Sequence, residues 1–403
     1  MEFLENKNIL ITGATGFLAK ILVEKILGIQ PNVKKLYLLL RAADETEAKK
    51  RFYNEVIEKD LFQVLRKKWG ANLNTLISEK ICLIPGEISL LQMGLKDSIW
   101  VDEMKNRVEI VINLAATTNF DERYDVALGT NTIGVEHVVR ANLYGWPNTY
   151  VFTKAMGEMT IGDLKNDLPL IIIRPTIVTS TYKEPFPGWV EGVRTIDSII
   201  VGYAKGKLTC FAAGTNSSLD LIPADIVVNT MIMAMVVHKD QPSDQTIYHV
   251  GSSARNSMTH IDLQRFSYQY FTQKPLIDKN GKAIKVGKVT LFNSMAKFHR
   301  YLAIRYLIFL KGLEFANIAF CHSFQDKYVD MRRKFNLVMR LIELYRPYLF
   351  FNAIFDDTNT ERLRNDIRNK DTNEAFVMDP KDINWEDYFM NVHFPGLVKH
   401  VIR

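Results

Sequence analysis

A tyrosine and a lysine, Tyr150 and Lys154, stand four residues apart at the start of a segment predicted to be helical as far as Asp167. At that spacing both side chains lie on one face of the helix. An ammonium group beside a phenol lowers the pKa of the phenol, which can then give its proton to a carbonyl oxygen as hydride arrives. About one such pair is expected by chance in a chain of this composition, so its meaning depends on the elements around it.

The first of those elements is an apolar strand that runs into a glycine turn and a helix, within Ile9–Lys20. Gly13 permits the tight turn, Gly16 leaves room for a pyrophosphate, and a small third residue lets the helix pack on the strand. The N–H groups of the first helical turn then face the phosphates. The alternative is an ordinary strand-to-helix turn. We predict a dinucleotide cradle made of Thr12, Gly13, Thr15, Gly16, Phe17 and Leu18.

A basic residue at the end of the second predicted strand indicates which dinucleotide is bound. The strand Leu36–Leu40 ends at Arg41, where a protein that prefers NAD would carry an acidic residue. The fork of Arg41 can meet a 2′-phosphate, which favours NADPH. A solvated arginine at a strand end is the alternative.

Two further strand ends are expected along the same crevice, because open α/β sheets bind ligands at the carboxyl ends of their strands. The strand Ile81–Ile84 leads to Glu87, a candidate adenine contact, and the strand Val108–Leu114 leads to Ala115, which is small enough for close approach. Either residue could equally be plain loop sequence. Lys154, in the later helix, is also predicted to hold the nicotinamide ribose.

The order of these elements predicts an α/β fold with a Rossmann-type, doubly wound parallel sheet. Residues 1–250 are expected to form an extended nucleotide-binding domain, and residues 251–403 a mainly helical C-terminal domain. A chain of 403 residues with 47% hydrophobic and 24% charged residues can bury a core of that size.

Composition also excludes some classes of site. The three cysteines, Cys82, Cys210 and Cys321, have no metal-ligand spacing, so neither a metal site nor a disulfide framework is predicted. The net charge of +6 is modest and no nucleic-acid motif is present. Only Met1–Lys7 precede the first core strand, and they lack the character of a signal or transit peptide.

A basic and aromatic region lies in the C-terminal half. Between Leu291 and Phe350 there are ten Lys or Arg against four Asp or Glu, yet no apolar run is long enough to span a membrane. Such a region could rest on an anionic membrane surface or attract an acidic, partly apolar substrate. A helical domain with solvated basic rims is the alternative.

The chain resembles a known family almost from end to end. The segments TGATGFLAK, LLLRA, NLAATTNF, YGWPNTYVFTKAMGE, PFPGWVEG and YRPYLFFNAIFDDTNTERL are similar to the alcohol-forming fatty acyl-CoA reductases of plants. The resemblance implies reduction of a long-chain acyl-CoA to an aldehyde and then to a primary alcohol with NADPH, for waxes or suberin. It also implies a cytoplasmic location or one at the cytoplasmic side of the endoplasmic reticulum. Oligomeric state and acyl chain length stay open.

The resemblance has one departure. After a helix predicted over Asn131–Ala141, the family has a fifth strand that ends in a Ser or Thr, whereas here Leu143 joins directly to Tyr144. A parallel sheet of repeated strand-helix units needs a strand at that place, and residues 142–149 contain Gly and Pro and no apolar run. We therefore predict that one central strand is missing.

That departure leaves alternatives for the function. Each buried unpaired backbone group costs about 1 to 3 kcal/mol, so the sheet and the catalysis are both expected to suffer. Thr117 or Thr118 is a candidate replacement for the missing hydroxyl. Besides an active reductase, the chain could be an impaired paralogue or truncated isoform that binds NADP(H) without turnover. An extended short-chain enzyme acting on a sugar nucleotide is disfavoured by the C-terminal resemblance.

Overall fold

The computed structural model describes residues 2–95, 98–118, 122–132, 148–215, 217–240, 245–368, 376 and 379–402. The chain forms two compact units. The first unit contains Met1–Val193, Leu221–Asn256 and Asp356–Arg403, and the second contains Arg194–Asp220 and Ser257–Phe355.

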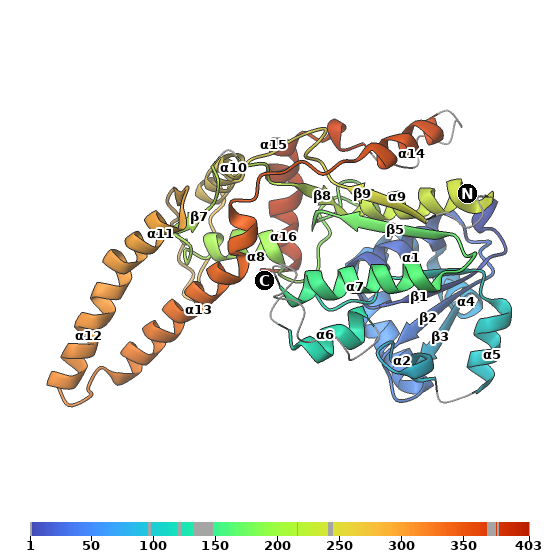
Figure 1. Ribbon diagram of the computed structural model, residues 1–403, viewed down its shortest axis with the longest axis horizontal. Coiled ribbons are helices and arrows are strands. Elements are labelled where there is room, and N and C mark those ends of the chain that lie inside the picture. Colours follow the sequence, from blue (N-terminus) through green and yellow to red (C-terminus); the bar gives the residue numbers. More distant parts are fainter. Residues whose placement is uncertain are drawn as a thin grey trace. The chain divides into compact units, whose positions relative to one another are not determined.

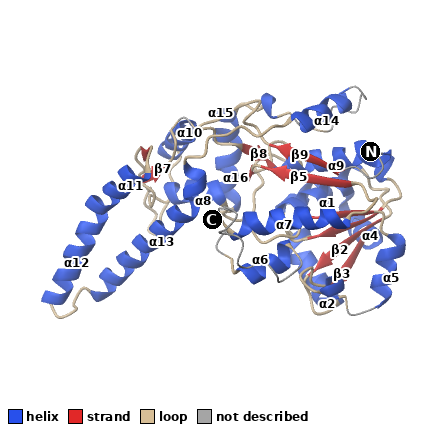
Figure 2. Ribbon diagram, in the orientation of Figure 1, coloured by secondary structure: helices blue, strands red, loops and turns tan. Residues whose placement is uncertain are grey.

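The first unit is built on a parallel four-stranded sheet, shown by the arrows of Figure 2. Its strand order is β3 (Ile81–Pro85), β2 (Lys35–Leu40), β1 (Asn8–Thr12) and β4 (Ile110–Asn113). Ile9 of β1 pairs with a residue of β2 on one side and of β4 on the other. All of β1 is buried, as expected for a strand covered on both faces. This confirms the predicted Rossmann-type core.

Helices follow the strands of the first unit in the order that the sequence predicts. The α-helices of this unit are α1 (Phe17–Ile29), α2 (Glu45–Phe52), α3 (Gln63–Trp69), α4 (Leu73–Lys80), α5 (Ser98–Arg107), α6 (Tyr124–Asn131), α7 (Thr149–Leu164), α9 (Ala224–Val237), α14 (Thr358–Arg368), α15 (Trp385–Asp387) and α16 (Phe394–His400). Figure 1 labels all of these helices except α3.

The sheet is interrupted where the sequence predicts a missing strand. Beyond β4 lies no further strand pairing among the described residues, and β5 (Leu170–Pro175) pairs only with β9 (Gln245–Val250) in a separate parallel pair. A third parallel pair joins β6 (Ile177–Thr179) to β8 (Leu221–Pro223). Val111 in β4 is 63% exposed, although strands in the middle of such sheets are normally covered. The described part of the sheet therefore has two open edges, on β4 and on β5.

Only the first two residues of the helix predicted over Asn131–Ala141 are described. In the structure the helix here is α6, which spans Tyr124–Asn131 and therefore ends where the predicted helix begins. Thr132 is extended, with φ −151° and ψ 148°, and its hydroxyl donates to the backbone oxygen of Thr153. That bond stops the helix. Residues 133–141 of the prediction lie outside the described residues, as does the junction at Leu143 and Tyr144.

The compact units also divide the chain differently from the predicted boundary at residue 250. Residues 356–403 belong to the first unit, because their side chains bind to its strands and turns. The guanidinium of Arg255 donates to Asp357 at 2.9 Å and to Glu361 at 2.9 Å. Thr360 donates to the backbone oxygen of His249 at 2.7 Å. These contacts return the C-terminal segment to the nucleotide-binding fold.

The second unit is mainly helical. Its helices are α8 (Thr195–Ala204), α10 (His260–Gln273), α11 (Met295–Leu302), α12 (Ile308–Ala319) and α13 (Gln325–Leu349), with the parallel pair β7 (Cys210–Ala212) and β10 (Thr290–Phe292). Its core packs Phe298 and Leu302 of α11 against Ile342 and Leu349 of α13. Helix α12 continues from α11 through a π-helical turn.

Candidate active site

The glycine turn between β1 and α1 has the shape expected of a phosphate cradle. Gly13 has φ +66°, a left-handed conformation that favours glycine, and its carbonyl accepts a bond from the N–H of Gly16 at 2.8 Å. A Cβ on Gly13 would lie 2.7 Å from the backbone nitrogen of Ala115. Gly16 is the N-cap of α1 and offers no side chain to its first turn. The first N–H groups of α1 therefore have no side-chain cap in the way of an anion.

Thr12 and Ala115 join the ends of β1 and β4. The Thr12 hydroxyl donates to the side-chain oxygen of Asn113 at 2.5 Å and accepts from the N–H of Ala115 at 3.3 Å. Thr12 is buried, whereas Thr15 and Leu18 are partly exposed in the turn and first helical residues. Thr12 thus holds the two strand ends together, and the backbone of Ala115 lies directly against Gly13.

Arg41 and Glu87 meet at the ends of β2 and β3. Their Nε and Oε2 atoms are 3.4 Å apart, and the Arg41 side chain is 79% exposed. Glu87 also accepts from the hydroxyl of Ser89 at 3.1 Å. An ion pair this exposed is weak. The guanidinium of Arg41 can therefore turn to a phosphate at little cost, and the two residues predicted as separate contacts lie side by side.

Helix α7 carries the predicted catalytic pair. The side chain of Asn148 accepts from the N–H of Val151 at 3.0 Å. Asn148 is thus the N-cap of α7, just before Tyr150. Burial raises the pKa of Tyr150 above its usual value. Burial also lowers the pKa of Lys154, while the charge of Glu158 acts in the opposite direction. The expected lowering of the tyrosine pKa by the lysine is therefore not found here, because burial dominates both groups.

Both borders of the interrupted sheet are tied to α7. On the β4 side, Asn131 accepts from the N–H of Thr117 at 3.0 Å and donates to the hydroxyl of Thr153 at 3.0 Å. On the β5 side, Arg174 forms a forked ion pair with Glu158. The helix that carries Tyr150 is thus held to the segment after β4 and to β5.

Asn131 is the residue that sequence reasoning missed. A Cβ on Gly157 of α7 would lie 2.6 Å from the backbone oxygen of Asn131, so α6 and α7 approach as closely as a glycine allows. Asn131 was predicted as the first residue of a helix and not as a link between elements. No local pattern marks it, because its partners Thr117 and Thr153 lie 14 and 22 residues away.

The candidate replacement hydroxyls follow β4. Thr117 is partly buried and bonds to Asn131 through its N–H, and Thr118 is exposed. The structure therefore places Thr117 next to the link with α7.

The aromatic turn at Pro185–Trp189 packs against the start of α1. Trp189 is buried and its ring stacks on that of Phe17, with centroids 5.1 Å apart and an interplanar angle of 21°. Lys20 of α1 binds Glu191 of the same loop, with an Nζ to Oε1 distance of 2.7 Å. Trp189 is therefore packed against α1.

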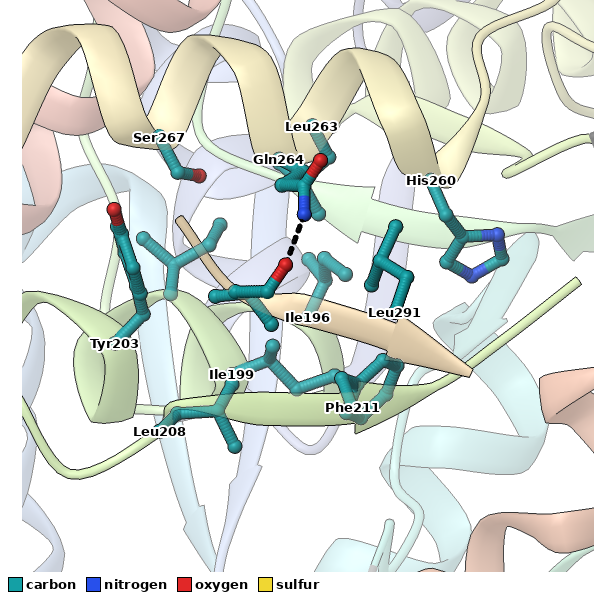
Figure 3. A pocket seen from close by; sticks show the side chains of 12 residues that line it. Ile196, Ile199, Tyr203, Leu208, Phe211, His260, Leu263, Gln264, Ser267 and Leu291 are labelled. Atoms are coloured by element: carbon teal, nitrogen blue, oxygen red, sulfur yellow. Dashed lines mark hydrogen bonds between the residues drawn. The ribbon is translucent and has the colours of Figure 1, made fainter. Parts of the chain in front are cut away.

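A hollow in the second unit contains none of the predicted site residues. Figure 3 shows its apolar wall, with Ile196, Ile199, Leu208, Phe211 and Leu291 pointing inward and Gln264 bonded to the backbone oxygen of Val289. His260 lies at one end, and burial lowers its pKa. The hollow suits an aliphatic group better than a nucleotide.

The residues that the structure describes offer neither a metal site nor a membrane-spanning helix. They hold no group of three or more His, Cys, Asp or Glu placed to bind a metal ion. Among them no helix is both long and apolar enough to cross a bilayer.

Comparison with known sequences gives a consistent result. Two family models described as "Male sterility protein" match the chain, one over residues 11–142 and 140–231, the other over residues 305–403. The chain is 46% identical to "Fatty acyl-CoA reductase 1" of Arabidopsis thaliana, covering 100% of this chain and 99% of that protein. It is 44% identical to "Alcohol-forming fatty acyl-CoA reductase" of Simmondsia chinensis, with the same coverage.

The sequence matches also locate the departure from the family. The first family model matches in two pieces that meet at residues 140–142, where the sequence predicts that a strand is missing. The alignment with the Arabidopsis protein runs over 485 positions, whereas this chain has 403 residues. The relative therefore has residues to which nothing in this chain corresponds.

Solved structures confirm the fold. The terminal R domain of the myxalamid biosynthetic pathway superposes with a TM-score of 0.59 at 15% identity, covering 98% of this chain and 91% of that one. The reductase domain of a nonribosomal peptide synthetase from Mycobacterium tuberculosis gives 0.51 at 17% identity, with coverage of 73% and 75%. At these identities the likeness concerns the fold alone.

Proposed function

The chain belongs to the fatty acyl-CoA reductase family, and from that premise we propose that it reduces a long-chain fatty acyl-CoA to a primary alcohol with NADPH. The observation that carries the proposal is the attachment of α7, with Tyr150 and Lys154, to the end of β4 through Asn131. The backbone directly after β4, at Ala115, also lies against Gly13. One strand end thus serves both the cradle and the catalytic helix.

The residues at the glycine turn fit a nicotinamide dinucleotide. A Cβ on Gly13 would clash with the backbone, and the uncapped first turn of α1 suits a pyrophosphate. Gly13, Gly16 and the N–H groups that follow would hold the phosphates, and Arg41 would hold the 2′-phosphate in place of its weak bond to Glu87. NADPH, when bound, supplies the hydride.

Tyr150 is proposed as the proton donor. Its raised pKa keeps the phenol protonated through the neutral range, which is the form that a proton donor requires. Lys154, one turn further along α7, is proposed to hold the nicotinamide ribose and to restore the proton. Because burial lowers the pKa of Lys154, its ammonium gives up a proton more readily than an exposed lysine would.

The reaction takes two reductions at the same site. In the first, NADPH would supply hydride to the thioester carbonyl, and cleavage of the carbon–sulfur bond with uptake of a proton would release coenzyme A as a thiol and give the aldehyde. In the second, Tyr150 would donate its proton to the aldehyde oxygen while another NADPH supplied the hydride, giving the alcohol. Each of the two reductions therefore consumes one NADPH and one proton.

A second candidate function is NADP(H) binding without turnover. It is favoured by the edges of β4 and β5, which pair with no further strand among the described residues, and by the exposure of Val111 in β4. The family's Ser or Thr at the missing strand end would bind the substrate carbonyl, and Thr117 and Thr118 would have to replace it. The cradle residues do not depend on that strand.

The test is to incubate the purified chain with NADPH and palmitoyl-CoA and to measure both NADPH oxidation and fatty alcohol. The proposal expects alcohol from the chain, none from Tyr150→Phe, and unchanged NADPH binding in that variant. Tyr53→Phe, a partly buried tyrosine that has no proposed role, is the matched control and should stay active. NADPH binding without alcohol in the unaltered chain would support the second candidate.

We also propose that the protein acts as a peripheral protein at the cytoplasmic side of the endoplasmic reticulum membrane. The excess of Lys and Arg between Leu291 and Phe350 supports this placement, because basic and aromatic segments bind anionic lipid surfaces. A fluorescent fusion that stays with soluble protein after cell fractionation would contradict it.

A further inference from the structure

The hairpin formed by α12 and α13 carries exposed apolar side chains. Figure 1 shows the two helices running side by side in opposite directions, joined by a short turn at residues 320–324. We call this segment, residues 308–349, the hairpin. Large apolar residues that are more than a third exposed recur along it and its flanks: Ile304, Ile308, Phe309, Phe315, Ile318, Phe320, Phe324, Val329, Val338, Tyr348, Phe351, Ile354 and Phe355.

The outward face of α12 is apolar. Ile308, Phe315 and Ile318 are spaced by seven and three residues, so they share one face of the helix, and each is between 63% and 73% exposed. Leu310 and Asn317 lie on the opposite face and are buried. A helix in water normally turns its apolar face inward, and here a large part of that face is outside.

Between the two helices lies a polar network. Asn317, which is only 3% exposed, donates to Gln325 at 2.6 Å and accepts from the N–H of Phe324 at 3.0 Å. Tyr328 of α13 donates to Glu314 of α12 at 2.7 Å. At this end of the hairpin the polar side chain of Asn317 is therefore buried and hydrogen-bonded, whereas several large apolar side chains are exposed.

Two phenylalanines cap the turn. Phe320 and Phe324 contact each other edge to face, with ring centroids 6.0 Å apart, and they are 63% and 41% exposed. Aromatic side chains at such a tip match the boundary between headgroups and acyl chains. In water these two rings leave a large apolar surface exposed to solvent.

The charges of α13 indicate which apolar partner would fit. Six basic residues stand against three acidic ones in this helix, and the basic ones are Lys327, Arg332, Arg333, Lys334, Arg340 and Arg346. Two copies of the hairpin placed face to face would bring these like charges together. A surface of anionic lipid would pair with them while accepting the apolar side chains.

We infer that the hairpin is the membrane-binding element of this protein, and that it inserts the apolar face of α12 and the tip at Phe320 and Phe324 into the headgroup region of an anionic bilayer. The inference rests on the proposed peripheral attachment and names the segment responsible. No described helix could span a bilayer, so the hairpin lies within the interface. It would hold the enzyme where long-chain substrates and alcohol products partition.

The experiment is co-sedimentation of the full chain with vesicles of phosphatidylcholine alone or with phosphatidylserine. We expect binding that is stronger with phosphatidylserine. The variant F315S/F320S/F324S should bind about tenfold or more weakly, because three large apolar side chains no longer leave water. The variant R333E/K334E should lose the preference for phosphatidylserine. The control L164S/L168S changes two leucines of the first unit that are as exposed as these phenylalanines, and it should bind as the unaltered chain does.

A second measurement does not depend on a disruptive change. Phe320→Trp keeps an aromatic ring at the tip, and its fluorescence should shift to the blue with vesicles and be quenched by brominated lipid. Unaltered vesicle binding by the triple variant, with no shift for the tryptophan, would overturn the assignment to the hairpin while leaving peripheral attachment intact. A dimer in light scattering that the triple variant makes monomeric would show that a second copy covers this face instead. Loss of vesicle binding by the unaltered chain would reject the attachment itself.

Discussion

Replacing Gly13 by alanine tests whether the glycine turn is built as the structure shows. With φ +66°, alanine at this position would adopt a left-handed conformation that costs about 1 to 2 kcal/mol. Its Cβ would also lie 2.7 and 2.8 Å from the N and Cα of Ala115 and 2.9 Å from the carbonyl carbon of Leu114. All three are backbone atoms and cannot rotate away, so the overlap adds about 1 to 3 kcal/mol. Together the two effects should lower the free energy of unfolding by roughly 2 to 5 kcal/mol.

Gly281→Ala is the matched control, because it separates the two effects. Gly281 has φ +77°, and nothing lies within 4 Å of the place where its Cβ would stand. This variant should therefore show only the backbone term of about 1 to 2 kcal/mol. The difference between the two variants measures how closely the turn approaches Ala115.

The assays are urea unfolding of each variant and titration with NADPH. Because the chain would relieve the overlap by moving the turn away from Ala115, the dissociation constant for NADPH should rise about tenfold or more, equivalent to about 1.4 kcal/mol. The Gly281→Ala variant should bind NADPH normally. Equal losses of stability in both variants, with NADPH binding intact in Gly13→Ala, would refute the reasoning.

Two further predictions concern single buried groups. Burial raises the pKa of Glu24 to about 8, so the folded chain keeps a proton that the unfolded chain releases near pH 4.5. The free energy of unfolding should therefore fall as the pH rises between these two values, by up to about 1.4 kcal/mol per pH unit. Glu24→Gln should remove this slope in melts at pH 5 and pH 8, whereas exposed Glu58→Gln should keep it; an unchanged slope in Glu24→Gln would contradict the assignment. Asn131→Ala should lose its bonds to Thr117 and Thr153 and about 1 to 3 kcal/mol of stability, with a lower kcat and near-normal NADPH binding. If kcat stays the same, Asn131 does not position α7.

Much of the first unit could be predicted because its signals are local. An apolar run followed by Gly13 and Gly16 specifies a strand, a turn and a helix within a dozen residues, and the structure has β1 and α1 there. A strand missing between β4 and β5 is predicted in the same way, since a repeated strand-helix order makes an absent member visible. The sheet is interrupted between β4 and β5 in the described residues, and the family match breaks at the same place.

What could not be predicted depends on partners that are distant in the sequence. At the end of α6, Asn131 and Thr132 bond to Thr153. No sequence pattern near residue 131 predicts these bonds. Likewise, the domain boundary predicted at residue 250 rests on the change from alternating strands and helices to mainly helical sequence. The structure instead brings Asp357 back to Arg255, 102 residues earlier.

By itself the sequence determined the order of strands and helices, the glycine turn between β1 and α1, the placement of Tyr150 and Lys154 on one helix, and the family. Only the tertiary structure decided that Arg41 meets Glu87, that Asn131 ties the end of β4 to α7, and that the hairpin buries Asn317 while it exposes large apolar side chains. The physical reason is the range of the forces involved. Backbone conformation and side-chain period are set by near neighbours, whereas burial, ion pairing and the pKa of a buried group depend on whatever the folded chain brings alongside.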